Sequence, residues 1–182
     1  MSRESGPAAV GFRVIRSCLQ ILLIACFGAG PVSVRTAHSQ EVKSPDGSLR
    51  VRIISVSTSC AENRIAIFNA SGALLYRKDF SSSDCEHGQV IVRSQWTPDS
   101  KFFVFNTEST GGHQPGHRPV LFYSRRSNRL YRLENFIGYI VAQDFGLEAP
   151  HIIRTEKQKT VGEGEGVPVG LDLDRLLRYR LQ

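Results

Sequence analysis

The stretch that decides the fold class is Trp96-Thr-Pro-Asp-Ser-Lys-Phe-Phe-Val-Phe-Asn-Thr107, which joins a tight turn to a strand. Pro98 fixes φ near the value that the second residue of a type I or II turn requires. The side chains of Asp99 and Ser100 can hydrogen-bond to the backbone of such a turn. The residues that follow, 102–105, are apolar without interruption. A short, continuous apolar run predicts a strand that is buried on both faces of its sheet.

A turn of the same kind occurs earlier, as Ser44-Pro-Asp-Gly-Ser48, and precedes the strand-like residues 49–56. It begins 53 residues before Thr97. Each unit then continues with a sequence typical of a β-hairpin, at 64–77 and at 119–133. Because the order of elements recurs at a nearly constant offset, the sequence predicts an internal repeat.

The two Pro-Asp turns and the two hairpins resemble the blades of TolB-like and WD40-like β-propeller proteins, whose repeats carry a Ser-Pro-Asp-Gly turn. The resemblance covers about residues 44–134. Propellers contain about four to eight blades, whereas this chain has material for two units and part of a third. We expect an all-β protein, an antiparallel meander of two to three propeller-blade-like units in one domain; a β-sandwich is the alternative.

The remainder of the chain adds shorter signals. Further strands are expected at 89–93, 136–141 and 151–154. The polar stretch 157–166 is rich in Gly and Glu and predicts a mobile loop. Residues 167–173 alternate like a strand, whereas the leucines from Leu173 onward are spaced like one face of a helix. We therefore expect a strand that runs into a short C-terminal helix.

Residues 1–39 have the pattern of a secretory signal peptide. Three arginines precede the apolar run 19–27, which is followed by glycines and a proline. This run is shorter than the about 20 apolar residues that a membrane-spanning helix needs. Ala37-His-Ser39 supplies the small residues that a signal peptidase recognises. We expect cleavage after Ser39, a single domain over 40–182, and a periplasmic or secreted protein.

Leu23-Ile-Ala-Cys26 supports a second interpretation of the leader, because it resembles a bacterial lipobox. Cys26 would then be lipidated, and the protein would be a membrane-anchored lipoprotein. In either case, half of the formal net charge of +6 belongs to residues 1–39. The remaining chain is only mildly basic, so we do not expect nucleic acid as a partner.

Cys60 and Cys85 are the cysteines that follow the leader. An even pair of cysteines in an exported protein forms a disulfide by default. The bond would close a loop around the first hairpin, for which chain-entropy models give roughly 3 kcal/mol of stabilisation. A metal-binding pair or a redox pair is the alternative, although neither cysteine belongs to a Cys-x-x-Cys motif.

His113 and His117 are the best metal-binding candidates, and they lie in the polar loop 111–117. A zinc or copper site would need one or two more ligands. The candidates are His87, Glu86 and Glu108. The alternative is an exposed polar loop whose glycines permit a tight path.

A basic cluster lies across the second hairpin and consists of Arg118, Arg125, Arg126, Arg129 and Arg132. Arginines on one strand face could bind an anionic partner such as lipid headgroups, a polyanionic glycan or an acidic protein surface. The alternative is a solvated face whose charges prevent a sheet edge from pairing with another chain.

The sequence contains no nucleophile-elbow motif and no nucleotide-binding loop, and we expect neither a catalytic residue nor a cofactor. These patterns favour an exported, non-enzymatic binding or assembly module of the bacterial envelope. The alternative is a small secreted metal-binding protein or enzyme that uses the 111–117 loop. Completion of the sheet by homo-oligomerisation is a third hypothesis.

Overall fold

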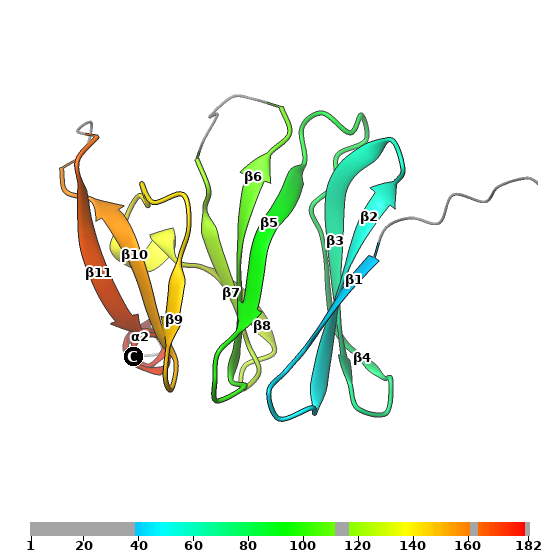
Figure 1. The fold of residues 1–182 in the computed structure, drawn as a ribbon, viewed down its shortest axis with the longest axis horizontal. Helices are drawn as coiled ribbons and strands as arrows, with labels where there is room; N and C mark the ends of the chain where they lie inside the picture. Colours follow the sequence, from blue (N-terminus) through cyan, green and yellow to red (C-terminus); the bar gives the residue numbers. More distant parts are fainter. Residues whose placement is uncertain (1–38, 112–116, 161–163, 181–182) are drawn as a thin grey trace, which may run out of the picture. The chain divides into compact units, whose positions relative to one another are not determined.

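The computed structural model describes residues 39–111, 117–160 and 164–180, and the statements below concern these residues. They form three antiparallel sheets and two short helices (Figure 1). The predicted all-β class with blade-like meanders and a short C-terminal helix is confirmed. The alternative of a two-sheet sandwich is wrong, because three sheets are present. Neither of the described helices is long and apolar enough to cross a membrane.

The strands of each sheet follow one another in chain order or its reverse, as in a meander. The first sheet contains β1 (Ser39–Lys43), β2 (Leu49–Ser57), β3 (Cys60–Asn69) and β4 (Leu74–Asp79). The second contains β5 (Gln89–Trp96), β6 (Phe102–Ser109), β7 (Val120–Ser124) and β8 (Arg129–Arg132). After α1 (Glu134–Ile137), the third contains β9 (Gly146–Glu148), β10 (Ile152–Gln158) and β11 (Gly166–Asp172). The helix α2 (Leu173–Arg180) comes last.

The two Pro-Asp turns have the same hydrogen bonds, which confirms the predicted repeat. In each turn a hydroxyl donates to the aspartate and accepts the N–H of the first strand residue. The residues concerned are Ser44, Asp46 and Leu49 in the first turn, and Thr97, Asp99 and Phe102 in the second. The residue after each aspartate has a left-handed backbone, with φ of 69° at Gly47 and 61° at Ser100.

A third turn joins β9 to β10 and marks a third unit. Pro45, Pro98 and Pro150 are separated by 53 and 52 residues and occupy equivalent places between the first two strands of their sheets. The next residue is an aspartate in the first two turns and His151 in the third. In this third unit, α2 follows the third strand at the point where the other two units have their fourth strand.

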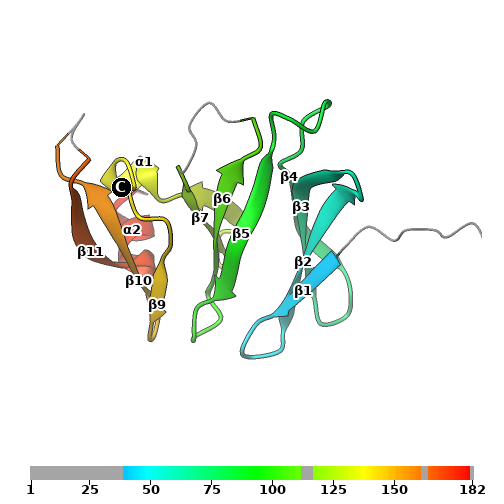
Figure 2. The ribbon, with the colours of Figure 1, turned by 45° about the horizontal axis from the view of Figure 1, so that its top comes forward.

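The second sheet lies between the other two, because its two faces belong to different hydrophobic clusters (Figures 1 and 2). Phe103 of β6 belongs to a cluster with Ile67 of the first sheet. Its neighbour Phe102 belongs to a cluster with Ile153 of the third sheet. All four side chains of 102–105 are at most 1% exposed, so the predicted burial on both faces is confirmed.

Trp96, the last residue of β5, connects the first two sheets. Its indole Nε1 donates a hydrogen bond of 3.3 Å to the carbonyl oxygen of Val42 in β1. The ring packs against Phe103, with centroids 5.3 Å apart. This contact positions β1 against the second sheet.

One prediction of local structure is wrong, and the bounds of another differ from the structure. The strand predicted at 136–141 is replaced by α1, which Gly138 ends with a φ of 83°; Ile140 makes only an isolated bridge to Lys157. A short apolar run fits a helical turn as well as a strand, and here it packs against the second cluster. The stretch 157–166 is shorter as a loop than predicted, because β10 and β11 still pair where Gln158 meets Gly166.

Candidate functional site

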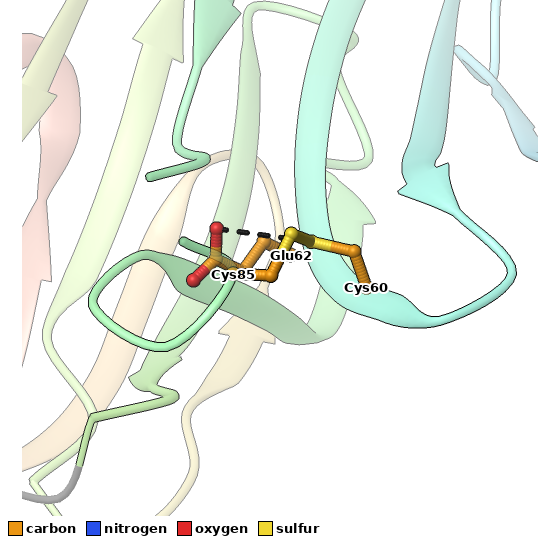
Figure 3. A group of neighbouring side chains, drawn as sticks. All are labelled: Cys60, Glu62 and Cys85. Carbon is orange, nitrogen blue, oxygen red and sulfur yellow. Dashed lines mark hydrogen bonds between the residues drawn. A yellow bond between two sulfur atoms is a disulfide. The ribbon is translucent and has the colours of Figure 1, made fainter. Parts of the chain in front are cut away.

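Cys60 and Cys85 form the predicted disulfide, with Cα atoms 5.4 Å apart (Figure 3). Cys60 begins β3 and Cys85 lies between β4 and β5, so the bond ties this loop to the first sheet. Glu62 Oε2 lies 3.9 Å from the Cys60 sulfur. Since the two sulfurs are bonded to each other, neither is the thiolate that a metal ion would need.

Glu62 is a fully buried carboxylate that the sequence analysis did not single out. It accepts hydrogen bonds from the Ser82 N–H at 2.6 Å, the Gly88 N–H at 2.6 Å and the Thr110 hydroxyl at 2.7 Å. Burial acts to raise the pKa of Glu62, but these hydrogen bonds outweigh burial and lower the pKa below its usual value. A Cβ at Gly88 would lie 2.3 Å from Glu62 Cδ, so the loop needs a glycine there. Glu62 is therefore a structural anion that anchors the loop.

His117 lies in a largely enclosed setting, whereas His113 lies outside the described residues. The imidazole of His117 stacks on the ring of Tyr139, with centroids 4.3 Å apart. Its Nε2 lies 3.0 Å from Glu134 Oε1. Within the described ranges, the other candidate ligands form no metal-binding group with His117. The metal-site hypothesis thus depends on His113 and stays a prediction.

The arginines of the second hairpin are dispersed rather than gathered on one face. Three of them pair with carboxylates: Arg118 with Glu108, Arg125 with Asp46, and Arg132 with Glu134. Arg126 and Arg129 are exposed, and in the described part of the chain neither has a carboxylate at ion-pair distance. Because Arg129 and Arg132 are three positions apart on β8, they project to opposite faces of the sheet.

His151 joins the second Pro-Asp turn to the start of α2. Its Nδ1 lies 2.6 Å from Asp99 Oδ2, and its Nε2 lies 3.2 Å from Asp172 Oδ1 and 3.7 Å from Asp174 Oδ2. Lys101 Nζ is 2.9 Å from Asp174 Oδ2. Both ring nitrogens of His151 thus face carboxylates. This arrangement cross-links the second and third units and leaves neither nitrogen open to a substrate.

Asp99 is held as an anion by this arrangement. Burial acts to raise the pKa of Asp99, but hydrogen bonds from Thr97, His151 and the Lys101 backbone lower it below its usual value. Asp46 occupies the equivalent place in the first turn. Hydrogen bonds, first of all from the Ser44 hydroxyl, lower the pKa of Asp46 far below its usual range.

The outer face of the first sheet carries many basic side chains, and we call it the arginine face. It lies opposite the side chains of Val51 and Ile67, which point into the core. The arginine face consists of Lys43, Arg50, Arg52, Arg64, Arg77, Glu41 and Asp79. Phe68 lies among them, with the guanidinium groups of Arg50 and Arg52 at 5.9 and 5.2 Å from its ring centroid.

The arginine face has more cations than its carboxylates neutralise. Two ion pairs lie on it, Arg52 with Glu41 at 3.1 Å and Arg64 with Asp79 at 2.7 Å. The other cations, Lys43, Arg50 and Arg77, have no carboxylate at ion-pair distance among the residues that the structure describes. The alternation Leu49-Arg-Val-Arg-Ile53 is the sequence signal that could have identified this face, because it sends both arginines to one side of the strand.

No protein-family model and no curated protein matches the sequence. Among solved structures, the chain is similar to the β-propeller domain of the Trilobed protease from Pyrococcus furiosus, whose description reports an open velcro topology. The two are 12% identical with a TM-score of 0.43, and the match covers 76% of this chain. The chain spans 44% of the length of that matched chain.

Proposed function

We propose that the protein is an exported, non-enzymatic binding module of the bacterial envelope, and that it binds an acidic polymer through the arginine face. The observation that carries this proposal is the surplus of three cations, Lys43, Arg50 and Arg77, on one exposed sheet face. The leader pattern and the Cys60–Cys85 bond support export, because disulfides persist in oxidising compartments.

The spacing of these cations suits a partner with repeated charges. Side chains two positions apart on a strand are separated by roughly 7 Å, and neighbouring strands by about 4.8 Å. A chain with regularly spaced carboxylate, sulfate or phosphate groups can therefore meet several of the cations at once. Single exposed ion pairs contribute little in water, but several contacts along one partner act together.

Retention on immobilised acidic polysaccharide, eluted with a salt gradient, tests this proposal. We expect the Arg50→Gln/Arg77→Gln double variant to elute at clearly lower salt than the wild type, because salt screens exposed charges. The matched control is Arg129→Gln/Arg175→Gln, which removes the same charge from two exposed arginines outside the arginine face. An equal shift in both variants would show only a net-charge effect and would contradict the proposal. Retention by anionic vesicles but not by the polysaccharide would also contradict it.

Intact mass spectrometry of the protein from its host tests export. A chain that begins near Gln40, with Cys60 and Cys85 unreactive until reduced, supports a soluble envelope protein. A chain that begins at Cys26 with added lipid mass supports the lipoprotein alternative. An uncleaved chain with free thiols would contradict export altogether.

A further inference from the structure

Two adjoining hollows lie at the end of the second sheet, where the turn 97–101, the β7–β8 hairpin and α2 meet. The larger has a volume of about 510 Å³ and the smaller about 330 Å³. Both are lined by Ser124, Arg126 and Asp174, so the two hollows share a wall. Volumes of roughly 300–1,000 Å³ are typical of sites for small molecules.

Ser124 places an unused hydroxyl in the wall that the two hollows share. It is the last residue of β7 and only 1% exposed. Its Oγ is buried and has no hydrogen-bond partner within the described ranges. A serine hydroxyl can both donate and accept, and buried polar groups in native proteins nearly always have a partner. A ligand atom in the hollow would supply that partner.

The charges around the hollows favour an anion. The lining side chains include the cations Lys101, Arg125, Arg126 and Arg178 and the carboxylates Asp99 and Asp174. The carboxylates are already bound by Lys101 and His151, and Arg125 is bound to a carboxylate of the first turn. Arg126 and Arg178 remain, and neither has a carboxylate at ion-pair distance among the described residues.

The smaller hollow also offers apolar surface, from Tyr131 and Leu177. The Tyr131 ring is held in place by stacking on Phe122, with centroids 5.4 Å apart. Its hydroxyl donates to Ser127 Oγ at 3.1 Å. A flat or aliphatic group could lie against this ring while a charged group reaches the arginines.

We propose that these hollows form one binding site for a small organic oxyanion. The anionic group, a phosphate or a carboxylate, is bound by Arg126, Arg178 and the Ser124 hydroxyl. The body of the ligand packs between Tyr131 and Leu177. This site is separate from the arginine face, so neither proposal depends on the other.

Titration calorimetry on the exported protein tests the site, with phenyl phosphate, benzoate, inorganic phosphate and benzyl alcohol as probes. We expect saturable binding of phenyl phosphate or benzoate, and binding at least tenfold weaker for benzyl alcohol, which lacks the charge. The stronger of the two aromatic anions identifies which oxyanion the site prefers. Inorganic phosphate should compete weakly, because it cannot use Tyr131 and Leu177. Equal binding of benzyl alcohol, or no saturable binding of either aromatic anion, would overturn the proposal.

Variants locate the binding. Arg126→Gln and Arg178→Gln should each weaken binding of the aromatic anion about tenfold, and Ser124→Ala several-fold. Arg129→Gln is the matched control, because Arg129 belongs to the same hairpin but does not line either hollow. Thermal unfolding of each variant checks that the fold is intact. Unchanged binding in both Arg126→Gln and Arg178→Gln, or an equal loss in Arg129→Gln, would place the anion elsewhere and refute the site.

Discussion

The first and second sheets arise from equivalent sequence units but have different surroundings. In β2 the buried residues Leu49, Val51 and Ile53 alternate with more exposed ones, whereas Phe102–Thr107 in β6 is buried throughout. The first sheet packs against a neighbour on one face and presents the arginine face on the other. The second sheet packs against neighbours on both faces.

One strand motif thus serves two positions in the molecule, and the residues between the core positions decide whether the strand lies in an outer or an inner sheet. In both units the turn, the register and the first core residue are retained. Exchanging arginines for apolar residues converts an outer face into an inner one. After the turn, a strand with alternating apolar residues packs against one neighbouring sheet, whereas a strand with a continuous apolar run packs against two.

The largest expected effect is the cost of a core substitution in the second sheet. Phe103→Ala should lower the free energy of unfolding by about 3–5 kcal/mol, because it leaves a cavity between two sheets. The matched change Phe68→Ala, on the arginine face, should cost about 1 kcal/mol, because its ring is only half-buried. Urea unfolding of both variants measures the difference. Similar costs would mean that the two faces are not distinct environments.

The disulfide should stabilise the first sheet more than the other two sheets. Cys60→Ser/Cys85→Ser should lower the free energy of unfolding by about 2–4 kcal/mol, since the open chain loses a constraint across a separation of 25 residues. Denaturant titration with and without reductant checks this. Reductant should destabilise the wild type by a similar amount and leave the double variant unchanged. A wild type that is indifferent to reductant would refute the contribution.

The two turn aspartates allow a sharper comparison. Asp99→Asn should cost about 1–3 kcal/mol, because a largely buried charged hydrogen bond to His151 is lost. Asp46→Asn should cost about 1 kcal/mol or less, because Asp46 is exposed and solvent screens both its hydrogen bonds from Ser44 and Ser48 and its pairing with Arg125. Thermal unfolding at pH 7 compares the two. An equal or greater cost at Asp46 would contradict the assigned difference in burial.

The smallest effect concerns pH. The pKa values of Asp99 and Asp172 lie below their usual value in the folded protein, with burial opposed by hydrogen bonds and, at Asp172, by the charge of His151. Their stabilisation is therefore complete above about pH 4 and is lost as the pH falls through the folded pKa values. The stability difference between wild type and Asp99→Asn should shrink below pH 4. Melting temperatures from pH 7 to pH 2.5 test this, and a constant difference would contradict it.

Local patterns in the sequence predict much of the fold. The Pro-Asp turns, the strands around them and the strand-to-helix end at Leu173 all follow from short-range backbone preferences. The disulfide follows from the pairing of two cysteines behind a predicted export signal. Two strands, β1 and β9, were not predicted, because β1 is exposed at four of its five residues and the three residues of β9 are too few to show a period.

The candidate sites depend on contacts between distant residues, and local patterns do not contain them. Arg125 meets Asp46 across 79 positions, so the basic cluster predicted on the second hairpin is partly neutralised by another sheet. Glu62 lies in β3 next to Asn63 and Arg64, and its hydrogen-bond partners come from two later segments. Strand alternation alone would put Glu62 on the same face as Arg64, so the local pattern does not reveal that Glu62 is buried.

The aspartate in each of the first two turns is bound by a residue of the following unit, Asp46 by Arg125 and Asp99 by His151. In both cases the partner of the aspartate comes from the unit that follows it in the chain. His151 stands where the third aspartate would be. His151 binds Asp99 of the preceding unit but supplies no carboxylate of its own. The third turn therefore lacks the group that binds the following unit in the first two turns. A His151→Asp substitution would remove the bond to Asp99. It would also introduce a carboxylate that has no assigned hydrogen-bond donor.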